Sequence, residues 1–218
     1  MKIDMHTHTT YSDGLNTPEE MIKAAIKKGL DGIAVTDHDN VKGSIAAQIF
    51  AKSLKKEFLV ITGTEIRSAK GDILAYGIKE NVKPMMSVEE TVERIHDLGG
   101  IAVAAHPFQI ISMKQGIGEE ATKTDGIEVL NSGNIFMSLN RKSEELAKRY
   151  SMPVSAGSDS HCILSVGNAG IICDGDPLQA IMKKKVRIFG GRMPYLIMAY
   201  STMISLPKFL MKRKLPTF

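Results

Sequence analysis

The chain has 218 residues, 43% of them hydrophobic, which is long enough for one large core and short for two. Its formal net charge of +4 suits anionic substrates, but this charge and the absence of a visible aromatic platform give no reason to expect a stable nucleic-acid complex. The two cysteines, Cys162 and Cys173, exclude a disulfide framework, and together with the lack of a basic-then-apolar leader they favour a cytoplasmic location.

Strand-like and helix-like patterns alternate along the chain, which is typical of an α/β fold. In chain order, the expected strands are residues 3–5, 32–36, 58–66, 72–77, 101–105, 126–130, 153–156, 169–173 and 186–189. The expected helices are residues 18–29, 41–55, 87–98, 138–150 and 177–185. The strand at 72–77 has no crossover helix before it, so it is expected to add as a hairpin partner. Residues 108–123 are expected to form an irregular rim.

Five of the six histidines follow directly on apolar strand-like runs. These are His6, His8, His38, His106 and His161. Carboxylates occupy the same kind of place, at Asp37, Glu65 and Asp159. Side chains that gather at the carboxyl ends of many strands meet on one face of an α/β barrel, and imidazole is the commonest metal ligand. The sixth histidine, His96, lies inside a predicted helix and is expected to be a surface or packing residue.

At these positions the sequence resembles the PHP (polymerase and histidinol phosphatase) domain family. The resemblance rests on ordered motifs over nearly the whole chain: Asp4-Met5-His6-Thr7-His8, Tyr11-Ser12-Asp13-Gly14, Thr36-Asp37-His38, Gly63-Thr64-Glu65, Ala105-His106-Pro107 and Gly157-Ser158-Asp159-Ser160-His161. It implies a distorted (β/α)7 barrel over residues 1–191 and a stand-alone phosphoesterase similar to the TrpH group, with two or three divalent metal ions.

The family pattern also implies a ligand set. It places His6, His8, Glu65 and Asp159 around one metal ion, with Glu65 bridging to a second ion that His106 and Asn131 would hold. Asp13, His38 and His161 would hold a third ion. The expected reaction is hydrolysis of a phosphoester by a metal-bridged hydroxide. Asp4 and Asp37 are expected to lie outside this set, with Asp37 as a hydrogen-bond acceptor for its neighbour.

Asn131 departs from the pattern of trinuclear relatives, which have a histidine at about this position. An amide oxygen suits a harder ion than imidazole does, so Mn²⁺ is favoured, with Zn²⁺, Mg²⁺ and Fe²⁺ as alternatives. Three basic residues on the rim, Arg67, Lys70 and Arg141, are candidates for gripping the substrate phosphate.

The expected substrate is a phosphorylated small molecule, a nucleotide or an RNA end. Two other functions stay open at this point. One is an amidohydrolase-like C–N hydrolase, although Glu65 stands where such enzymes generally place a bridging lysine. The other is a non-catalytic metal-binding PHP module.

Residues 192–218 form a tail of different character. The uncharged run 193–207 is too short to span a bilayer and is followed by Lys208, Lys212, Arg213 and Lys214. An apolar stripe that includes Leu196, Tyr200 and Met203 predicts a helix packed on the barrel, with a weak membrane contact or a subunit contact as the alternative. The sequence does not predict an oligomeric state.

Overall fold

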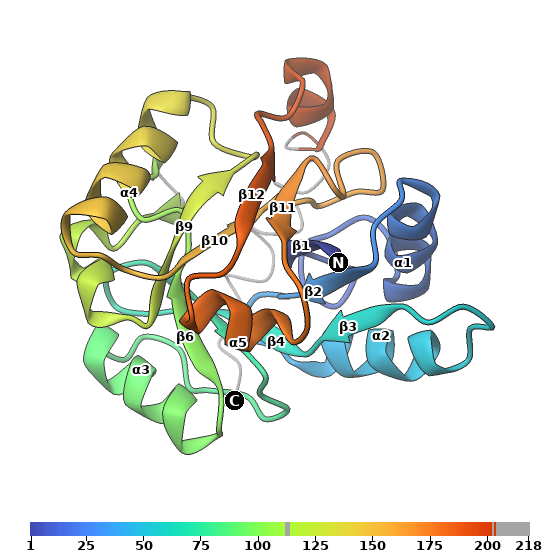
Figure 1. The fold of residues 1–218 in the computed structure, drawn as a ribbon, viewed down its shortest axis with the longest axis horizontal. Helices are drawn as coiled ribbons and strands as arrows, with labels where there is room; N and C mark the ends of the chain where they lie inside the picture. The colour runs from blue at the N-terminus through green and yellow to red at the C-terminus, as the bar shows by residue number, and fades with distance from the viewer. Residues whose placement is uncertain (112–113, 202, 204–218) are drawn as a thin grey trace.

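The computed structural model describes residues 1–111, 114–201 and 203. Two five-stranded sheets form its centre, with helices on their outer faces (Figure 1). The first sheet has the order β12-β11-β1-β2-β3, and its strands are β1 (Lys2–Thr7), β2 (Gly32–Val35), β3 (Leu59–Ile61), β11 (Ala169–Ile172) and β12 (Arg187–Gly190). The second has the order β10-β9-β6-β5-β4, and its strands are β4 (Gly63–Arg67), β5 (Asp72–Tyr76), β6 (Ile101–Ala104), β9 (Gly126–Asn131) and β10 (Val154–Gly157).

The helices largely agree with the sequence-based expectations. They are α1 (Pro18–Lys27), α2 (Lys42–Lys52), α3 (Val88–Asp97), α4 (Met137–Arg149) and α5 (Pro177–Met182). Capping boxes open α1 at Thr17 and α3 at Ser87. The predicted irregular rim contains the short strands β7 (Ile110–Ile111) and β8 (Lys114–Gln115) and a 3₁₀ helix, η1 (Gly118–Lys123).

Both sheets are mixed, so the fold is α/β, and the hairpin predicted for residues 72–77 is confirmed by the antiparallel pairing of β4 with β5. Isolated bridges join the sheets at two places, Thr7 to Ser160 and His38 to Glu65. The ladders of the described residues do not close into one barrel, so the (β/α)7 barrel is not confirmed and stays a proposal.

One predicted strand, 58–66, is wrong in a way that matters for the site. The chain leaves the first sheet after Ile61 and enters the second at Gly63. A Cβ atom at Gly63 would lie 2.2 Å from the carbonyl oxygen of Ala75, so only glycine allows this close crossing. The switch places Glu65 on the second sheet, facing the histidines of the first.

Three clusters of buried side chains hold these layers together. One lies between the sheets and includes Ile3, Met5 and Leu74. A second packs α3 and α4 on the second sheet, and a third packs α1 and α2 on β2 and β3. The core between the sheets ends where the polar side chains at the strand ends begin, which is where the candidate site lies.

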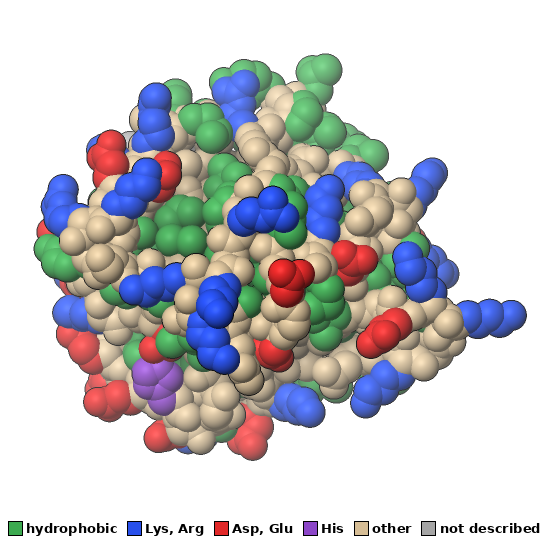
Figure 2. All heavy atoms as spheres, viewed as in Figure 1, with side chains coloured by type: hydrophobic (Ala, Val, Ile, Leu, Met, Phe, Trp, Pro, Cys, Tyr) green, Lys and Arg blue, Asp and Glu red, His purple; other side chains and the backbone are tan. Residues whose placement is uncertain are grey.

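The tail returns toward this end of the molecule. The N–H of Met193, which is buried, donates to the carbonyl oxygen of Ser132 at 2.9 Å, and residues 195–201 are helical. This helix buries Ser201, whereas Leu196 and Met203 are 87% and 69% exposed, so the expected packing is not seen for these members of the apolar stripe. Figure 2 shows apolar side chains gathered over this helix at the top of the view.

The basic run from Lys208 to Lys214 lies outside the described residues. In the part of the chain that the structure describes, none of the helices combines the length and apolar character needed to cross a bilayer. The domain boundary at residue 191 and the cytoplasmic location stay predictions.

Candidate metal centre

The predicted ligands come together at one end of the two sheets. His6 lies in β1 and His8 just after it, Glu65 lies in β4, and His106 and Asp159 follow β6 and β10. These five side chains are between 0% and 6% exposed. Ionisable side chains are seldom buried to this extent unless they pair with one another or bind a metal, so these five side chains are expected to do one or both.

Two imidazole nitrogens lie next to each other, and each lies close to two carboxylate oxygens. The Nε2 atoms of His6 and His8 lie 3.1 Å apart, and the Oε2 atom of Glu65 lies 3.4 Å and 3.2 Å from them. The Oδ1 atom of Asp159 lies 3.6 Å and 3.2 Å from the same two nitrogens.

These spacings fit a metal ion. Ligands about 2.1 Å from an ion in a tetrahedral arrangement are about 3.4 Å from one another. In addition, the buried Oε2 of Glu65 and Nδ1 of His8 make no hydrogen bond. The Oε2 atom of Glu65 lies between the imidazoles of His6, His8 and His38. Because its lone pairs are not used in a hydrogen bond, they are available to a cation, so these residues fit a divalent ion.

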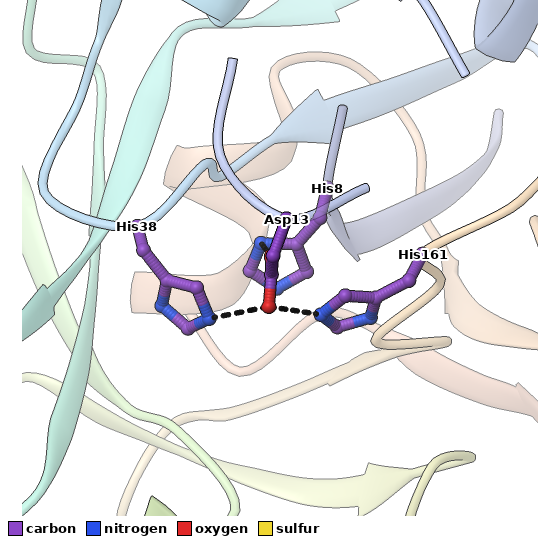
Figure 3. Close-up of side chains that lie close together, drawn as sticks. All are labelled: His8, Asp13, His38 and His161. Carbon is purple, nitrogen blue, oxygen red and sulfur yellow. Dashed lines mark ion pairs between the residues drawn. The ribbon is translucent and has the colours of Figure 1, made fainter. Parts of the chain in front are cut away.

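A second group of donors surrounds Asp13 (Figure 3). The Oδ2 atom of Asp13 lies 3.3 Å from Nε2 of His161 and 3.7 Å from Nε2 of His38, and its Oδ1 lies 3.9 Å from Nδ1 of His8. His8 and His38 each present their other ring nitrogen to Glu65, His38 at 3.1 Å. The two groups of donors therefore share residues and form one continuous centre.

A third group forms around His106. Its Nε2 atom lies 2.9 Å from Oε1 of Glu65, while its buried Nδ1 makes no hydrogen bond. Asp72, at the start of β5, offers a carboxylate oxygen within 4.8 Å of these donors. None of the sequence motifs contains Asp72, but its place opposite β4 in the predicted hairpin is a signal for it.

Two of the predicted ligands have an uncommon backbone conformation. His106 and Asp159 have φ angles of 28° and 52°, in the left-handed region that side chains with a Cβ seldom adopt. Such conformations cost on the order of 1–3 kcal/mol and cluster at functional sites.

In the absence of metal, the histidines and carboxylates of the centre shift one another's pKa values. Burial would lower the pKa of His8, but the carboxylates of Asp159 and Glu65 outweigh it and raise the pKa to about 9. Burial would raise the pKa of Glu65, but His38 and His6 hold that pKa well below its usual range. Carboxylates and imidazoles thus stabilise one another where a cation would bind.

Glu128, which none of the sequence motifs indicated, contacts two of the predicted ligands. It lies in β9 and is 1% exposed, with its Oε1 3.0 Å from Nδ1 of His6. Its Oε2 accepts the backbone N–H of His106 at 2.8 Å and the side-chain amide of Asn131 at 2.9 Å. An N–H of His6 that donates to Glu128 leaves the lone pair of Nε2 directed at the other donors.

Asn131 lies at the centre, but its side chain has other partners. Its amide nitrogen donates to Glu128 and, at 3.4 Å, to Asp159, and its carbonyl oxygen accepts the N–H of Gly133 at 2.9 Å. Its role as a metal ligand stays a prediction.

Two further buried carboxylates hold the loops that carry ligands. Asp4 accepts hydrogen bonds from the N–H and the hydroxyl of Ser158, next to Asp159. Asp37 accepts the N–H of Thr9 at 2.7 Å and the hydroxyl of Ser12 at 2.6 Å, next to Asp13. Asp37 is therefore an acceptor, as expected, but for the loop after β1.

His96 lies apart from the centre, as predicted, and pairs with Asp125 at 2.8 Å on the surface. Cys162 is buried, with its Sγ 3.5 Å from the hydroxyl of Ser165, and does not belong to any of the donor groups found among the described residues.

The sequence of the chain matches two known protein families. The PHP domain family matches residues 4–114, which is 111 of the 218 residues, and the PHP-associated family matches residues 138–183. The chain belongs to the PHP family. The first PHP match contains six of the predicted ligands, and the PHP-associated match contains Asp159 and His161.

Relatives include an uncharacterized protein of Methanocaldococcus jannaschii, 35% identical over 145 residues, which cover 61% of this chain and 82% of that protein. A phosphoribosyl 1,2-cyclic phosphate 1,2-diphosphodiesterase of Eggerthella lenta is 32% identical over 100 residues, 43% of this chain and 37% of that protein.

The PHP fold is shared with a solved two-domain protein of Bacteroides vulgatus, which is described as containing a predicted PHP-like metal-dependent phosphoesterase. The TM-score is 0.70 at 17% identity, over 94% of this chain and 69% of that one. At this identity the likeness establishes the fold.

Proposed function

We propose that this PHP protein is a metal-dependent phosphoesterase that hydrolyses a phosphorylated small molecule or a nucleotide. The observation that carries the proposal is the buried pair His6 and His8, whose Nε2 atoms lie 3.1 Å apart and 3.2–3.6 Å from a carboxylate oxygen of Glu65 and of Asp159. Membership of the PHP family and the diesterase name of the Eggerthella lenta relative support it.

In this proposal each donor group would hold one divalent ion. His6, His8, Glu65 and Asp159 would hold the first, and Glu65 with His106 and Asn131 would hold a second. Asp13, His38 and His161 would hold a third. Bound divalent ions lower the pKa of a water molecule and neutralise the phosphoryl oxygens during hydrolysis.

Buried carboxylates outside the donor groups keep the donors in place. Glu128 fixes the ring of His6, and Asp4 and Asp37 fix the two ligand loops. Because the donors are already buried and aimed, little reorganisation is needed when an anionic substrate arrives.

The proposal is tested with purified protein loaded with Mn²⁺ and offered phosphomonoesters, phosphodiesters and amides. We expect turnover of a phosphoester, and loss of both turnover and bound metal in Glu65→Ala with the fold retained, because a donor is removed without opening an apolar core cavity. Glu145→Ala, an exposed glutamate of α4, is the matched control. Turnover of Glu65→Ala at the level of Glu145→Ala would contradict the assignment of Glu65, and hydrolysis of amides alone would support the C–N hydrolase.

We also propose that Mn²⁺ supports more activity than Zn²⁺, because Asn131 stands where an imidazole would favour zinc. Asn131→His should then retain more zinc after dialysis, as measured by elemental analysis. Three equivalents of tightly bound zinc in the protein as purified would argue against this preference.

A further inference from the structure

The three basic residues expected on the rim differ sharply in their surroundings. Arg141 is an exposed residue of α4, and the side chain of Lys70 is 65% exposed and lies 3.8 Å from Glu120. Arg67 is the last residue of β4, and its side chain is 32% exposed. Arg67 alone of the three is attached to a strand that carries a predicted ligand.

The position of Arg67 follows from the register of β4. Glu65 lies opposite Leu74, and Arg67 lies opposite Asp72. Leu74 belongs to the core between the sheets, so this face of β4 is the inner one. Residues two apart on a strand share a face and are about 6–7 Å apart, so Arg67 lies on the inner face one step outward from Glu65.

Asp39 fixes the side chain of Arg67. Its Oδ2 lies 2.5 Å from Nε of Arg67, and its Oδ1 accepts the backbone N–H of Arg67 at 2.9 Å. Asp39 directly follows His38, has a φ angle of 49°, and donates its own N–H to the carbonyl oxygen of Glu65 at 2.9 Å. Asp39 therefore links the guanidinium of Arg67 to the backbone of two predicted ligands, His38 and Glu65.

This arrangement leaves the outer edge of the guanidinium available. A guanidinium carries five N–H donors, and Asp39 uses the one on Nε. The described residues offer no hydrogen-bond acceptor to the two terminal nitrogens of Arg67. A pair of terminal N–H groups in a fixed plane matches two oxygens of a phosphate group.

We infer that Arg67, aimed by Asp39, binds phosphate oxygens of the substrate next to the metal centre. The inference rests on the proposed function, since it assigns the anion to the substrate of that site. The phosphate comes either from the group being cleaved or from a second phosphate on the same substrate. Arg67 is a substrate-binding residue in this inference, and Asp39 is a positioning residue.

The first test measures the binding of inorganic phosphate to the Mn²⁺-loaded protein by calorimetry, so it does not depend on finding the substrate. We expect Arg67→Ala to bind phosphate about tenfold or more weakly with unchanged metal content, because hydrogen bonds from a charged donor are lost. Arg67→Lys should recover part of the affinity, since it restores the charge without the planar pair of donors.

Arg141→Ala is the matched control, because it removes an arginine from an exposed helix. Asp39→Asn keeps an acceptor for the backbone N–H of Arg67 but removes the charge beside Nε, so it should weaken phosphate binding severalfold. Equal phosphate affinity in Arg67→Ala and Arg141→Ala overturns the inference. If Arg67→Ala does not fold, Arg67→Gln and Arg67→Lys decide by the same comparison.

The second test distinguishes the two sources of phosphate. A rise in KM of Arg67→Ala for simple phosphomonoesters and for substrates with a second phosphate assigns Arg67 to the group being cleaved. A rise confined to substrates with a second phosphate assigns it to that group. Absence of phosphoesterase activity in the wild-type protein would overturn the proposed function. The phosphate titration would still show whether Arg67 binds phosphate.

Discussion

Glu128 connects two predicted ligands through one buried carboxylate. One oxygen faces the ring of His6 and the other accepts the backbone N–H of His106. In Glu128→Gln an NH₂ group replaces one oxygen, so one of these bonds is lost or a donor faces a donor. We expect metal affinity to fall about 10–100-fold, as for other residues that orient a ligand.

Metal titration followed by elemental analysis measures this effect, and a melting curve monitors the fold. Glu93→Gln on the exposed face of α3 makes the same chemical change away from the centre. If both variants bind metal as the wild type does, Glu128 has only a structural role.

Protons compete with metal at His8. In the metal-free protein its pKa is raised to about 9 by Asp159 and Glu65, against the effect of burial. Below that pH His8 is protonated, and the proton on the coordinating nitrogen must leave before a metal binds. We therefore expect metal affinity to rise with pH up to about 9, by up to about tenfold per pH unit for each proton released.

Mn²⁺ titrations at a series of pH values, in buffers with different heats of ionisation, would measure both the affinity and the protons released. An affinity independent of pH between about 6 and 9 would show that His8 is already deprotonated in the metal-free protein.

The sequence predicted the residues of the site better than it predicted their surroundings. His6, His8, His38, Glu65 and Asp159 could be found because motifs at strand ends depend on local order along the chain. Glu128 lies inside an apolar strand between Ile127 and Val129, where its partner is 122 residues away. A charged residue in a buried strand is itself a signal, because it needs a partner there.

At the scale of the elements, the sequence predicted the strands and helices but not how most of the strands pair into sheets. Strands and helices follow from short patterns, and these were found nearly at the right bounds. The split of residues 58–66 into two strands depends on the contact of Gly63 with Ala75, which no local pattern contains. Sheet order depends on such long-range contacts, so the closed barrel expected from the resemblance could not be checked from the sequence.

Strands β1 and β10 approach each other closely at Gly157, so this position is expected to require glycine. A Cβ atom at Gly157 would lie 2.3 Å from Cβ of His6 and 2.6 Å from its backbone nitrogen. Gly157→Ala should therefore push the strands apart and displace His6. We expect a loss of about 1–3 kcal/mol in the free energy of unfolding, typical of overpacking.

Thermal melting and metal analysis of Gly157→Ala measure the two consequences. Gly191→Ala is the control, because a Cβ atom there meets no atom within 4 Å. If the two variants are equally stable and hold equal metal, the approach of β10 to His6 does not constrain the site.

At the scale of the whole molecule, the tail presents an apolar face to solvent. Met193 is buried, but Tyr195, Leu196 and Met203 are exposed. Deleting residues 195–218 keeps the contact of Met193 with Ser132, so we expect the melting temperature to change by no more than a few degrees and metal binding to be retained.

Sedimentation with liposomes tests the membrane contact. The basic residues from Lys208 to Lys214 would contribute roughly 1 kcal/mol per charge near anionic lipid. We expect the full chain, but not the truncated one, to sediment with anionic liposomes. A large fall in melting temperature on truncation would instead support packing of the tail on residues 1–191.

The predicted ligands extend from His6 to His161, that is, over 156 of the 218 residues, and both sheets contribute to them. Synthesis begins at the N-terminus, so His6 and His8 leave the ribosome long before Asp159 exists. A nascent chain can therefore hold only an incomplete set of the predicted ligands. If the proposed metal centre forms, tight metal binding would begin after most of the fold is made, and chains interrupted before Asp159 should be recognisable by their inability to retain the ion.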